Sequence, residues 1–252
     1  MIPYIRRKKI LETLHSKEIV YLDEIAEIVN VSQATIRRDL KLLEEENQVE
    51  ILQGGAAKIK INRAEKSSVE KMTINEEEKE IVGDYASTLV SDGQFIFIGP
   101  GTTENWMISG LKGKDVTVVT NGVFHIQKCV ENDIRTKLLG GDIKNDLSIT
   151  IGYEAIKQVE KMNFDKCFIG ASGFTLDRGA STSQSSVAEI NRTVIEHSKE
   201  VYLIVDSTKL GKDSKYKFAD ITDLTKIITT GDIPEEYKEI EKIYIIDVNE
   251  LD

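Results

Sequence analysis

The first sixty residues carry apolar side chains at helical spacing. Between residues 5 and 14, and again from residue 22 to 29, apolar positions recur every three or four residues, which predicts two short amphipathic helices. Asn30 suits the end of the second helix. Ser32 suits the start of a third, because its hydroxyl accepts a hydrogen bond from an otherwise unpaired N–H group. The pattern predicts a tight helix-turn-helix.

The third predicted helix runs from Gln33 to about Glu46 and has two distinct sides. One face is apolar, and the others carry Gln33, Thr35, Arg37, Arg38 and Lys41. A polar, basic surface of this kind suits entry into the major groove of DNA, where arginine donates two hydrogen bonds to guanine or contacts phosphates. An ordinary solvated helix face is the alternative, since basic residues alone do not distinguish the two. The two preceding helices and the capped turn favour a recognition helix.

A ribbon pattern follows the third helix. Residues 49 to 56 predict a short hairpin, in which Gly54 and Gly55 allow the backbone to turn and to approach a phosphate closely. This hairpin is the expected wing, so residues 1–60 are predicted to form a winged helix-turn-helix domain. The predicted DNA contacts are Ser32, Gln33, Thr35, Arg37, Arg38, Lys41, Gly54 and Gly55.

The pattern changes after residue 60. Residues 61–75 mix charge, serine and asparagine with little periodicity and are predicted to be a linker, in part helical. From residue 76 to 252 an amphipathic helix is followed by apolar strands that alternate with helical segments. The predicted strands are 95–98, 116–120, 137–139, 166–169, 201–206, 226–229 and 242–246. Strands separated by helices indicate an α/β domain with a mostly parallel sheet.

Polar residues follow several of these strands. The first strand runs into Gly99-Pro100-Gly101-Thr102-Thr103 and a helix that begins near Glu104. Glycine-rich turns before helices offer N–H groups to an anion, so this loop suits a phosphate group. A plain strand-to-helix turn is the alternative, and the loop has neither G-x-G-x-x-G nor a Walker lysine, so neither a dinucleotide nor a nucleoside triphosphate is implied. Further strand ends supply Thr120, Asn121, Gly140, Gly141, Gly170, Ser172, Gly173 and residues 206–209. Their convergence predicts a pocket.

Charge and composition limit the alternatives. The net charge is −10, but residues 1–60 contain ten basic and ten acidic side chains, so the acidity belongs to the second domain. No apolar run approaches the length of a membrane helix, so we expect a cytoplasmic protein without a membrane partner. The two cysteines and three histidines are scattered, so we predict no metal site, no catalytic pair and no cofactor.

The motifs resemble the DeoR family of transcriptional repressors. In the first domain the resemblance lies in Val31-Ser32, the run Thr35-Ile36-Arg37-Arg38-Asp39-Leu40, Leu43-Glu44 and Gly54-Gly55-Ala56. In the second it lies in Glu78-Lys79, residues 99–103, Thr120-Asn121, Leu139-Gly140-Gly141, Gly152 and residues 206–209. The resemblance implies a repressor that binds double-stranded operator DNA and a phosphorylated sugar, with a sensor domain similar to ribose-5-phosphate isomerase.

The wing departs from the family pattern. The family has a basic residue where this chain has Ile51 and a histidine where it has Gln53, so the contacts of the wing with DNA are in question. Lys58 and Lys60 are candidates to contact phosphates in their place, although a lysine in a linker is more often only solvated.

Within the family, the chain looks most like the lactose phosphotransferase repressors, whose inducer is tagatose 6-phosphate. The resemblance places Gly101, Thr102 and Thr103 around the phosphate, Asp206 and Lys209 near the sugar, and Glu189 at the pocket rim. The ordinary alternative for Lys209 is an exposed lysine in a polar loop, and for Asp206 it is a cap at the end of the strand. The predicted ligand site comprises Gly99, Gly101, Thr102, Thr103, Thr120, Asn121, Gly141, Ser172, Glu189, Asp206 and Lys209.

Two other functions compete with the repressor. A sugar-phosphate isomerase with an added DNA-binding domain needs a carboxylate base, for which Asp206 and Glu189 are candidates. A redox-sensing repressor needs a dinucleotide site, and the missing G-x-G-x-x-G counts against it. Because helix-turn-helix proteins usually read two-fold sites, we expect a homo-dimer or homo-tetramer.

Overall fold

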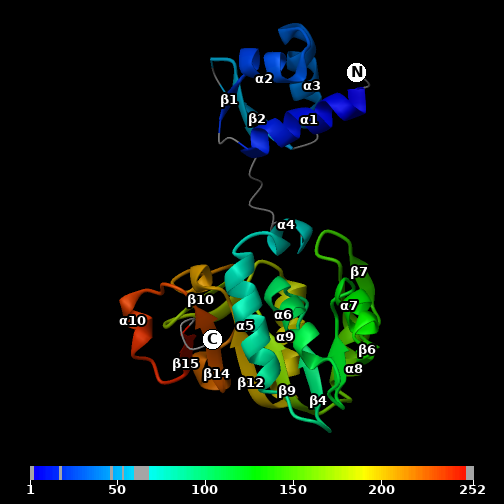
Figure 1. The fold of residues 1–252 in the computed structure, drawn as a ribbon, viewed down its shortest axis with the longest axis vertical. Coiled ribbons are helices and arrows are strands. Elements are labelled where there is room, and N and C mark those ends of the chain that lie inside the picture. The colour runs from blue at the N-terminus through cyan, green and yellow to red at the C-terminus, as the bar shows by residue number, and fades with distance from the viewer. Residues whose placement is uncertain (1–2, 17–18, 46–47, 53, 60–67, 248–252) are drawn as a thin grey trace. The chain divides into compact units, whose positions relative to one another are not determined.

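The computed structural model describes residues 3–16, 19–45, 48–52, 54–59 and 68–247. The chain divides into two compact units, residues 1–65 and residues 66–252, which are described separately. The elements of both units are labelled in Figure 1.

The first unit is a helix-turn-helix with a small antiparallel sheet. Its elements are α1 (Pro3–Ser16), β1 (Val20–Tyr21), α2 (Leu22–Val29), α3 (Gln33–Glu45), β2 (Val49–Leu52) and β3 (Ala56–Ile59). The predicted hairpin is β2–β3, and β1 adds a third strand beside β3 that the sequence pattern did not indicate, because it is two residues long. The core gathers apolar side chains from all three helices, including Ile10, Ile25 and Leu40.

The second unit contains a parallel sheet of seven strands, as predicted. The strand order is β15-β14-β12-β9-β4-β5-β6, and every neighbouring pair is parallel. The strands are β4 (Phe95–Ile98), β5 (Thr117–Thr120), β6 (Arg135–Leu138), β9 (Phe164–Ile169), β12 (Ser198–Ile204), β14 (Lys226–Thr230) and β15 (Ile243–Ile246). From β4 the order runs to β5 and β6 on one side and to β9 on the other, so a topological switch point lies between β4 and β9.

Helices cover both faces of this sheet (Figure 1). Successive strand residues point to opposite faces, so Ile96 and Ile98 pack with α5, α6 and α7 while Phe97 packs with α8 and α9. The helices are α4 (Ser68–Met72), α5 (Glu76–Thr88), α6 (Thr102–Met107), α7 (His125–Glu131), α8 (Tyr153–Val159), α9 (Ser185–Glu196), α10 (Glu235–Lys238) and the short 3-10 turns η1 (Ser109–Leu111), η2 (Ser207–Lys209) and η3 (Ile221–Asp223). Helix α4 falls within the predicted linker.

Two antiparallel additions to the sheet were not predicted. They are the hairpin of β7 (Asp142–Lys144) with β8 (Ile149–Ile151), and a sheet of β10 (Gly173–Thr175), β11 (Gly179–Thr182) and β13 (Tyr216–Ala219). These strands are only three or four residues long and contain glycine or polar residues, so they resemble loops when seen only as a pattern. None of the helices in the described ranges is long and apolar enough to cross a membrane.

Candidate DNA-binding face and effector site

The turn between α2 and α3 has the predicted caps. Asn30 ends α2 in the left-handed conformation with φ of 57°, and its N–H bonds back to carbonyls of α2. The Ser32 hydroxyl accepts a hydrogen bond from the N–H group of Thr35 at 3.4 Å and lies 3.0 Å from the Thr35 hydroxyl. These local contacts make the turn tight and set the direction of α3.

The polar side of α3 is open to solvent. Ser32, Gln33, Arg37, Arg38 and Lys41 are exposed, and Thr35 is half-buried. Among the described residues, Arg37 and Arg38 have no side-chain hydrogen bond or ion pair, so both guanidinium groups retain all their donors.

A groove lies between α3 and the hairpin. Its lining residues are Leu22, Arg37, Leu40, Lys41, Glu44, Ile51, Leu52 and Gly55. Gly54 and Gly55 have φ of 94° and 81°, which side chains rarely adopt, so the turn of the hairpin requires these glycines. The structure thus brings Arg37 and Lys41 of the predicted recognition helix together with Gly55 of the predicted wing in one groove of the first unit.

One residue of the recognition run has a structural role that the sequence did not reveal. Asp39 is 2% exposed, and its carboxylate forms an ion pair with Arg6 of α1 through two hydrogen bonds. The pair raises the pKa of Arg6. Arg6 therefore fastens α1 to α3 and is not part of an open basic cluster, whereas Lys8 and Lys9 are exposed.

The wing residues that depart from the family pattern differ in environment. Ile51 is half-buried against the core, and its N–H donates to the Glu44 carboxylate at 3.0 Å. Lys58, a predicted substitute contact, forms an ion pair with Glu50 at 3.2 Å. Gln53 and Lys60 lie outside the described residues.

In the second unit, the loop predicted to bind phosphate is occupied by a side chain of its own helix. Thr102 and Thr103 are buried in the first turn of α6. The carboxylate of Glu104 turns back to the loop and accepts a hydrogen bond from the N–H group of Gly170 at 2.7 Å, as well as from the N–H groups of Gly101 and Glu104. Burial raises the pKa of Glu104 to about 7, although these hydrogen bonds oppose the shift.

His125 links this loop to the end of the next strand. Its Nε2 lies 3.1 Å from the carbonyl oxygen of Gly101, and its Nδ1 lies 3.4 Å from the Thr120 hydroxyl, which also accepts from the N–H group of Gly122 at 3.0 Å. Since a carbonyl only accepts, Nε2 carries the proton and Nδ1 accepts from Thr120. Burial lowers the pKa of His125 to about 4, so the ring is neutral.

Asn121 and the β7–β8 hairpin form a second buried contact. The side-chain nitrogen of Asn121 donates to the carbonyl of Thr150 at 3.1 Å, and the Thr150 hydroxyl donates to the carbonyl of Leu139 at 2.7 Å. Within the described residues, Oδ1 of Asn121 is buried without a hydrogen-bond partner. Gly141 has φ of 150°, and a Cβ there would lie 2.4 Å from the carbonyl oxygen of Ile151, so this corner requires glycine.

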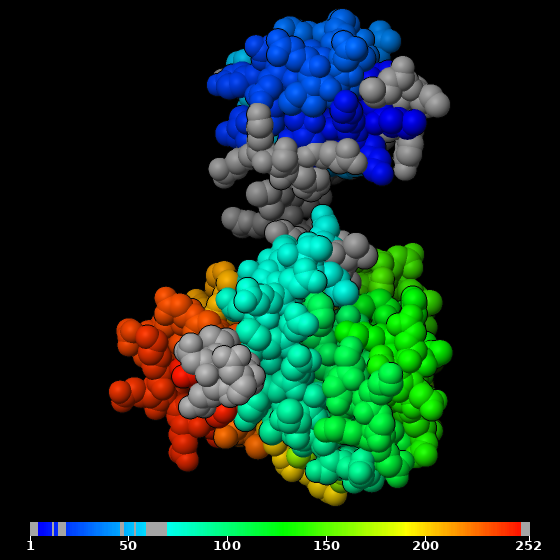
Figure 2. Space-filling view, in the orientation of Figure 1, coloured from blue at the N-terminus to red at the C-terminus, as the bar shows by residue number. Residues whose placement is uncertain are grey.

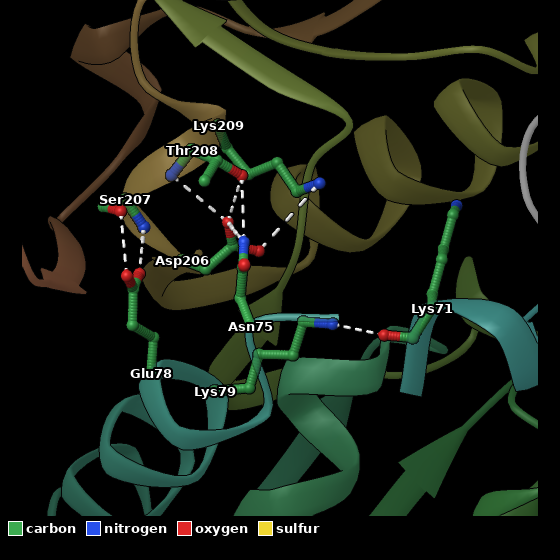
Figure 3. Close-up of polar contacts among 8 residues, drawn as sticks. All are labelled: Lys71, Asn75, Glu78, Lys79, Asp206, Ser207, Thr208 and Lys209. Carbon is green, nitrogen blue, oxygen red and sulfur yellow. Dashed lines mark hydrogen bonds and ion pairs between the residues drawn. The ribbon is translucent and has the colours of Figure 1, made fainter. Parts of the chain in front are cut away.

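Figure 3 shows the polar cluster at the end of β12, which meets the start of α5. Asp206 is 1% exposed and caps η2, and its Oδ1 accepts from the N–H group of Thr208 at 3.2 Å and from Asn75 at 3.1 Å. Lys209 lies 3.9 Å from Oδ2 of Asp206. Asp206 therefore caps the start of η2 at the end of β12, and its place near the sugar stays a prediction.

Residues of α5 complete this cluster, and the predicted site omitted them. The Glu78 carboxylate accepts from the N–H group of Ser207 at 2.9 Å and from its hydroxyl at 3.1 Å. Lys79 is 4% exposed and donates to the carbonyl of Lys71. Burial lowers the pKa of Lys79, against the attraction of Asp206 and Glu104. Glu78-Lys79 matched the family pattern, and this match was the feature of the sequence that pointed to these two residues as part of the site.

Lys79 interacts electrostatically with both polar clusters at the strand ends, the one around Asp206 and the one around Glu104. Both Asp206 after β12 and Glu104 after β4 act on its charge, as does the ammonium of Lys209. Parallel strands end at one edge of the sheet, so the loops after β4, β5, β9 and β12 lie along that edge.

The outer face of α5, which carries the exposed Glu76, Glu77 and Glu80, forms part of the surface of this unit (Figure 2).

Two further predicted ligand residues are Ser172, in the loop between β9 and β10, and Glu189, on α9. Ser172 is half-buried, and its backbone N–H donates to the carbonyl of Ser181 in the antiparallel sheet. Glu189 is exposed on α9, where its carbonyl accepts from the Thr193 hydroxyl. Among the described residues, the Glu189 side chain forms no hydrogen bond or ion pair with Glu104, His125 or Asp206.

Comparisons with known proteins cover both units. Residues 6–62 match the model of the DeoR-like helix-turn-helix domain, and residues 74–231 match the model of the DeoR C terminal sensor domain. An uncharacterized HTH-type transcriptional regulator of Bacillus subtilis, FruR, is 35% identical over 226 residues, which cover 89% of this chain and 90% of the relative. A lactose phosphotransferase system repressor of Staphylococcus epidermidis is 33% identical over 242 residues, covering 94% of this chain and 96% of the relative.

Among solved structures, ribose 5-phosphate isomerase A of Methanocaldococcus jannaschii matches with a TM-score of 0.41 and 20% identity, over 54% of this chain and 55% of that chain. The sensor-domain model covers more than half of the chain, and the relatives match along nearly all of it. The chain therefore belongs to the DeoR family, with a DNA-binding helix-turn-helix domain followed by a sensor domain.

Proposed function

We propose that this DeoR-family regulator represses an operon of sugar metabolism, and that a phosphorylated sugar releases it from its operator. The open arginine surface of α3, with its groove toward the wing, carries the DNA-binding part of the proposal. Relatives named as lactose phosphotransferase system repressors support the link to sugar metabolism, and tagatose 6-phosphate is accordingly the first effector to test.

The effector part of the proposal rests on the cationic groups at the strand ends. Lys209 lies 3.9 Å from the buried carboxylate of Asp206, which follows β12, and the charge of Lys79 on α5 interacts with Asp206 and with Glu104, which follows β4. A phosphate dianion gains charge-assisted hydrogen bonds from such groups, and a neutral sugar does not. Phosphorylation should therefore decide whether the sugar binds.

The first experiment measures release of DNA. A binding site is selected from randomised duplex DNA, and fluorescence anisotropy follows its complex with the full chain as sugar phosphates or the matching free sugars are added. We expect release by a sugar phosphate and none by its free sugar, because the effector acts through its preference for one conformational state. Equal effects of the two ligands would contradict the proposal.

A variant tests the loop itself. Replacing Thr102 and Thr103 with valine keeps their shape and removes two hydroxyl donors from the first turn of α6. We expect the double variant to bind the selected DNA as the unchanged chain does and to lose its response to the sugar phosphate. A normal response would place the phosphate elsewhere.

The isomerase alternative has less support. Asp206, one of its two candidate bases, is already bonded to Asn75 and Thr208, and Glu189 lies apart from it on α9. The relatives that match most of the chain are transcriptional regulators. We expect no interconversion when the purified chain is incubated with pentose and hexose phosphates, and turnover would replace the repressor proposal with an enzymatic one.

We also propose that the chain forms a homo-dimer or homo-tetramer. Light scattering, which gives the mass of the assembly in solution, tests this proposal.

A further inference from the structure

Glu104 fills the loop that the proposed effector must enter. Its side chain belongs to a residue that is 1% exposed, and its carboxylate accepts hydrogen bonds from the N–H groups of Gly170, Gly101 and Glu104 itself. These backbone donors are the ones that a glycine-rich loop offers to an anion. In this structure, a carboxylate of the same chain already uses them.

Three glycines fit closely around this carboxylate. A Cβ at Gly101 would lie 1.9 Å from Oε2 of Glu104, one at Gly99 would lie 2.9 Å from Oε1, and one at Gly170 would lie 3.0 Å from both oxygens. Any side chain at Gly101 would displace the carboxylate. Gly99 follows β4 and Gly170 follows β9, so Glu104 joins the two strands that flank the switch point of the sheet.

The charged and titratable groups around Glu104 come from two further elements. From α5, the positive charge of Lys79 favours the ionised carboxylate. The pKa of Lys79 is in turn raised by Asp206 and lowered by Lys209 and Lys71. From α7, the neutral ring of His125 reaches the carbonyl of Gly101. Burial outweighs the help from Lys79 and from the backbone donors, so the pKa of Glu104 rises to about 7 and both protonation states are populated near neutral pH.

We propose that the Glu104 carboxylate is a built-in competitor for the anionic group of the effector, so that a phosphate ester occupies the glycine loop only when this side chain gives up its backbone donors. The inference rests on the proposed function, because it concerns the same effector site. An ionised carboxylate repels the incoming dianion and uses the same N–H groups. The protonated acid holds those groups less strongly, so effector binding takes up as much as one proton from solvent at Glu104 well above pH 7 and less than one at lower pH.

The experiment compares the full chain with the variant Glu104→Gln, which keeps the size of the side chain and removes its charge. Sulfate is the probe, since its charge stays constant around neutral pH, and isothermal titration gives its Kd. If only the neutral form admits the anion, the variant should bind sulfate about as tightly as the unchanged chain near pH 6 and about tenfold more tightly near pH 8. The exposed Glu196→Gln on α9 is the control for lost charge, and its sulfate binding should follow the unchanged chain at both pH values.

A second measurement needs no ligand. The amide signals of Gly101 and Gly170 in an NMR titration of the unchanged chain should move with a midpoint near pH 7. In Glu104→Gln this transition should be absent. If the variant fails to fold, as judged by circular dichroism, sulfate titrations of the unchanged chain decide, and its affinity should fall about tenfold between pH 6 and pH 8.

The outcomes separate this inference from the proposed function. Sulfate binding that is equal in the two proteins at both pH values, or glycine amides without a transition near pH 7, would overturn the role of Glu104 and leave the anion site in place. If neither sulfate nor inorganic phosphate binds to any of the proteins, the loop is not an anion site, and the proposed location of the effector fails with it.

Discussion

In the first unit the side chains predicted to contact the ligand lie on the surface, whereas in the second unit most of them are buried. Arg37 and Arg38 are exposed and have no side-chain partner among the described residues. Thr120 and Asp206 are buried and bonded to neighbouring loops. An effector that binds among these buried and bonded side chains would have to rearrange the fold locally, whereas DNA would meet side chains that are already exposed.

The largest expected effect is a change of the free energy of unfolding with pH, which tests whether the pKa values of His125 and Glu104 are shifted in the folded protein. The pKa of His125 is lowered to about 4, so the neutral ring stabilises the fold above about pH 6.5, and this contribution of about 3 kcal/mol is lost as the pH falls toward 4. The pKa of Glu104 is raised to about 7, so its contribution, also about 3 kcal/mol, is present below about pH 4.5 and is lost as the pH rises toward 7. The two contributions oppose each other.

Glu104→Gln separates the two groups. We expect the free energy of unfolding of the sensor domain to rise by about 3 kcal/mol between about pH 4 and 6.5 in the variant, and the unchanged chain to rise by much less. Denaturant titrations followed by the fluorescence of Trp106, the single tryptophan, report on this domain. Equal pH dependence in the two proteins would show that Glu104 does not titrate in this range.

The next effect tests the exposed surface. Arg37→Ala and Arg38→Ala should each weaken binding to the selected DNA by about 1 to 3 kcal/mol if they contact bases, with stability changed by less than about 0.5 kcal/mol. Fluorescence anisotropy gives the affinity. Lys112→Ala, at an exposed position of the sensor domain, is the matched control. If both arginine variants bind like the control, α3 is not the recognition helix.

A single hydroxyl provides the corresponding test in the buried region. Thr120→Val keeps the shape of the side chain but removes the acceptor of the Gly122 N–H group and the donor to His125. We expect the free energy of unfolding to fall by about 1 to 3 kcal/mol, because a buried donor loses its partner. Thr222→Val, at an exposed site, is the control, and an equal effect of the two changes would show that the Thr120 contacts contribute nothing.

The smallest effect concerns the wing. Ile51→Arg should strengthen DNA binding slightly and increase the slope of log K against log salt by about one phosphate contact. Ile51 is half-buried on the core, so a small loss of stability should accompany the gain. Anisotropy titrations over a series of salt concentrations measure the slope. Binding that is weaker, or unchanged in its salt dependence, would show that the hairpin does not lie against the DNA backbone.

The sequence by itself determined the elements whose signals are local. The capped turn at Asn30 and Ser32, the exposed polar face of α3 and the apolar run of β4 each depend on neighbouring residues, so periodicity and capping were enough to predict them. The alternation of strands and helices likewise implied a parallel sheet. The two-residue strand β1 and the short antiparallel strands were not predicted. β1 pairs with the distant β3, and the hairpins β7–β8 and β10–β11 have strands of only three or four residues, which are too short for a clear periodicity.

Only the tertiary structure decided which polar side chains meet. Arg6 and Asp39 are 33 positions apart, Gly170 and Glu104 are 66 apart, and Ser207 and Glu78 are 129 apart. No local spacing signals such pairs, so the ion pair of Arg6 was not predicted and Lys79 was left out of the site. Asp206 and Glu104 show the physical reason. A buried carboxylate must find hydrogen-bond partners, and those partners are supplied by whichever loops the sheet order brings to the same edge.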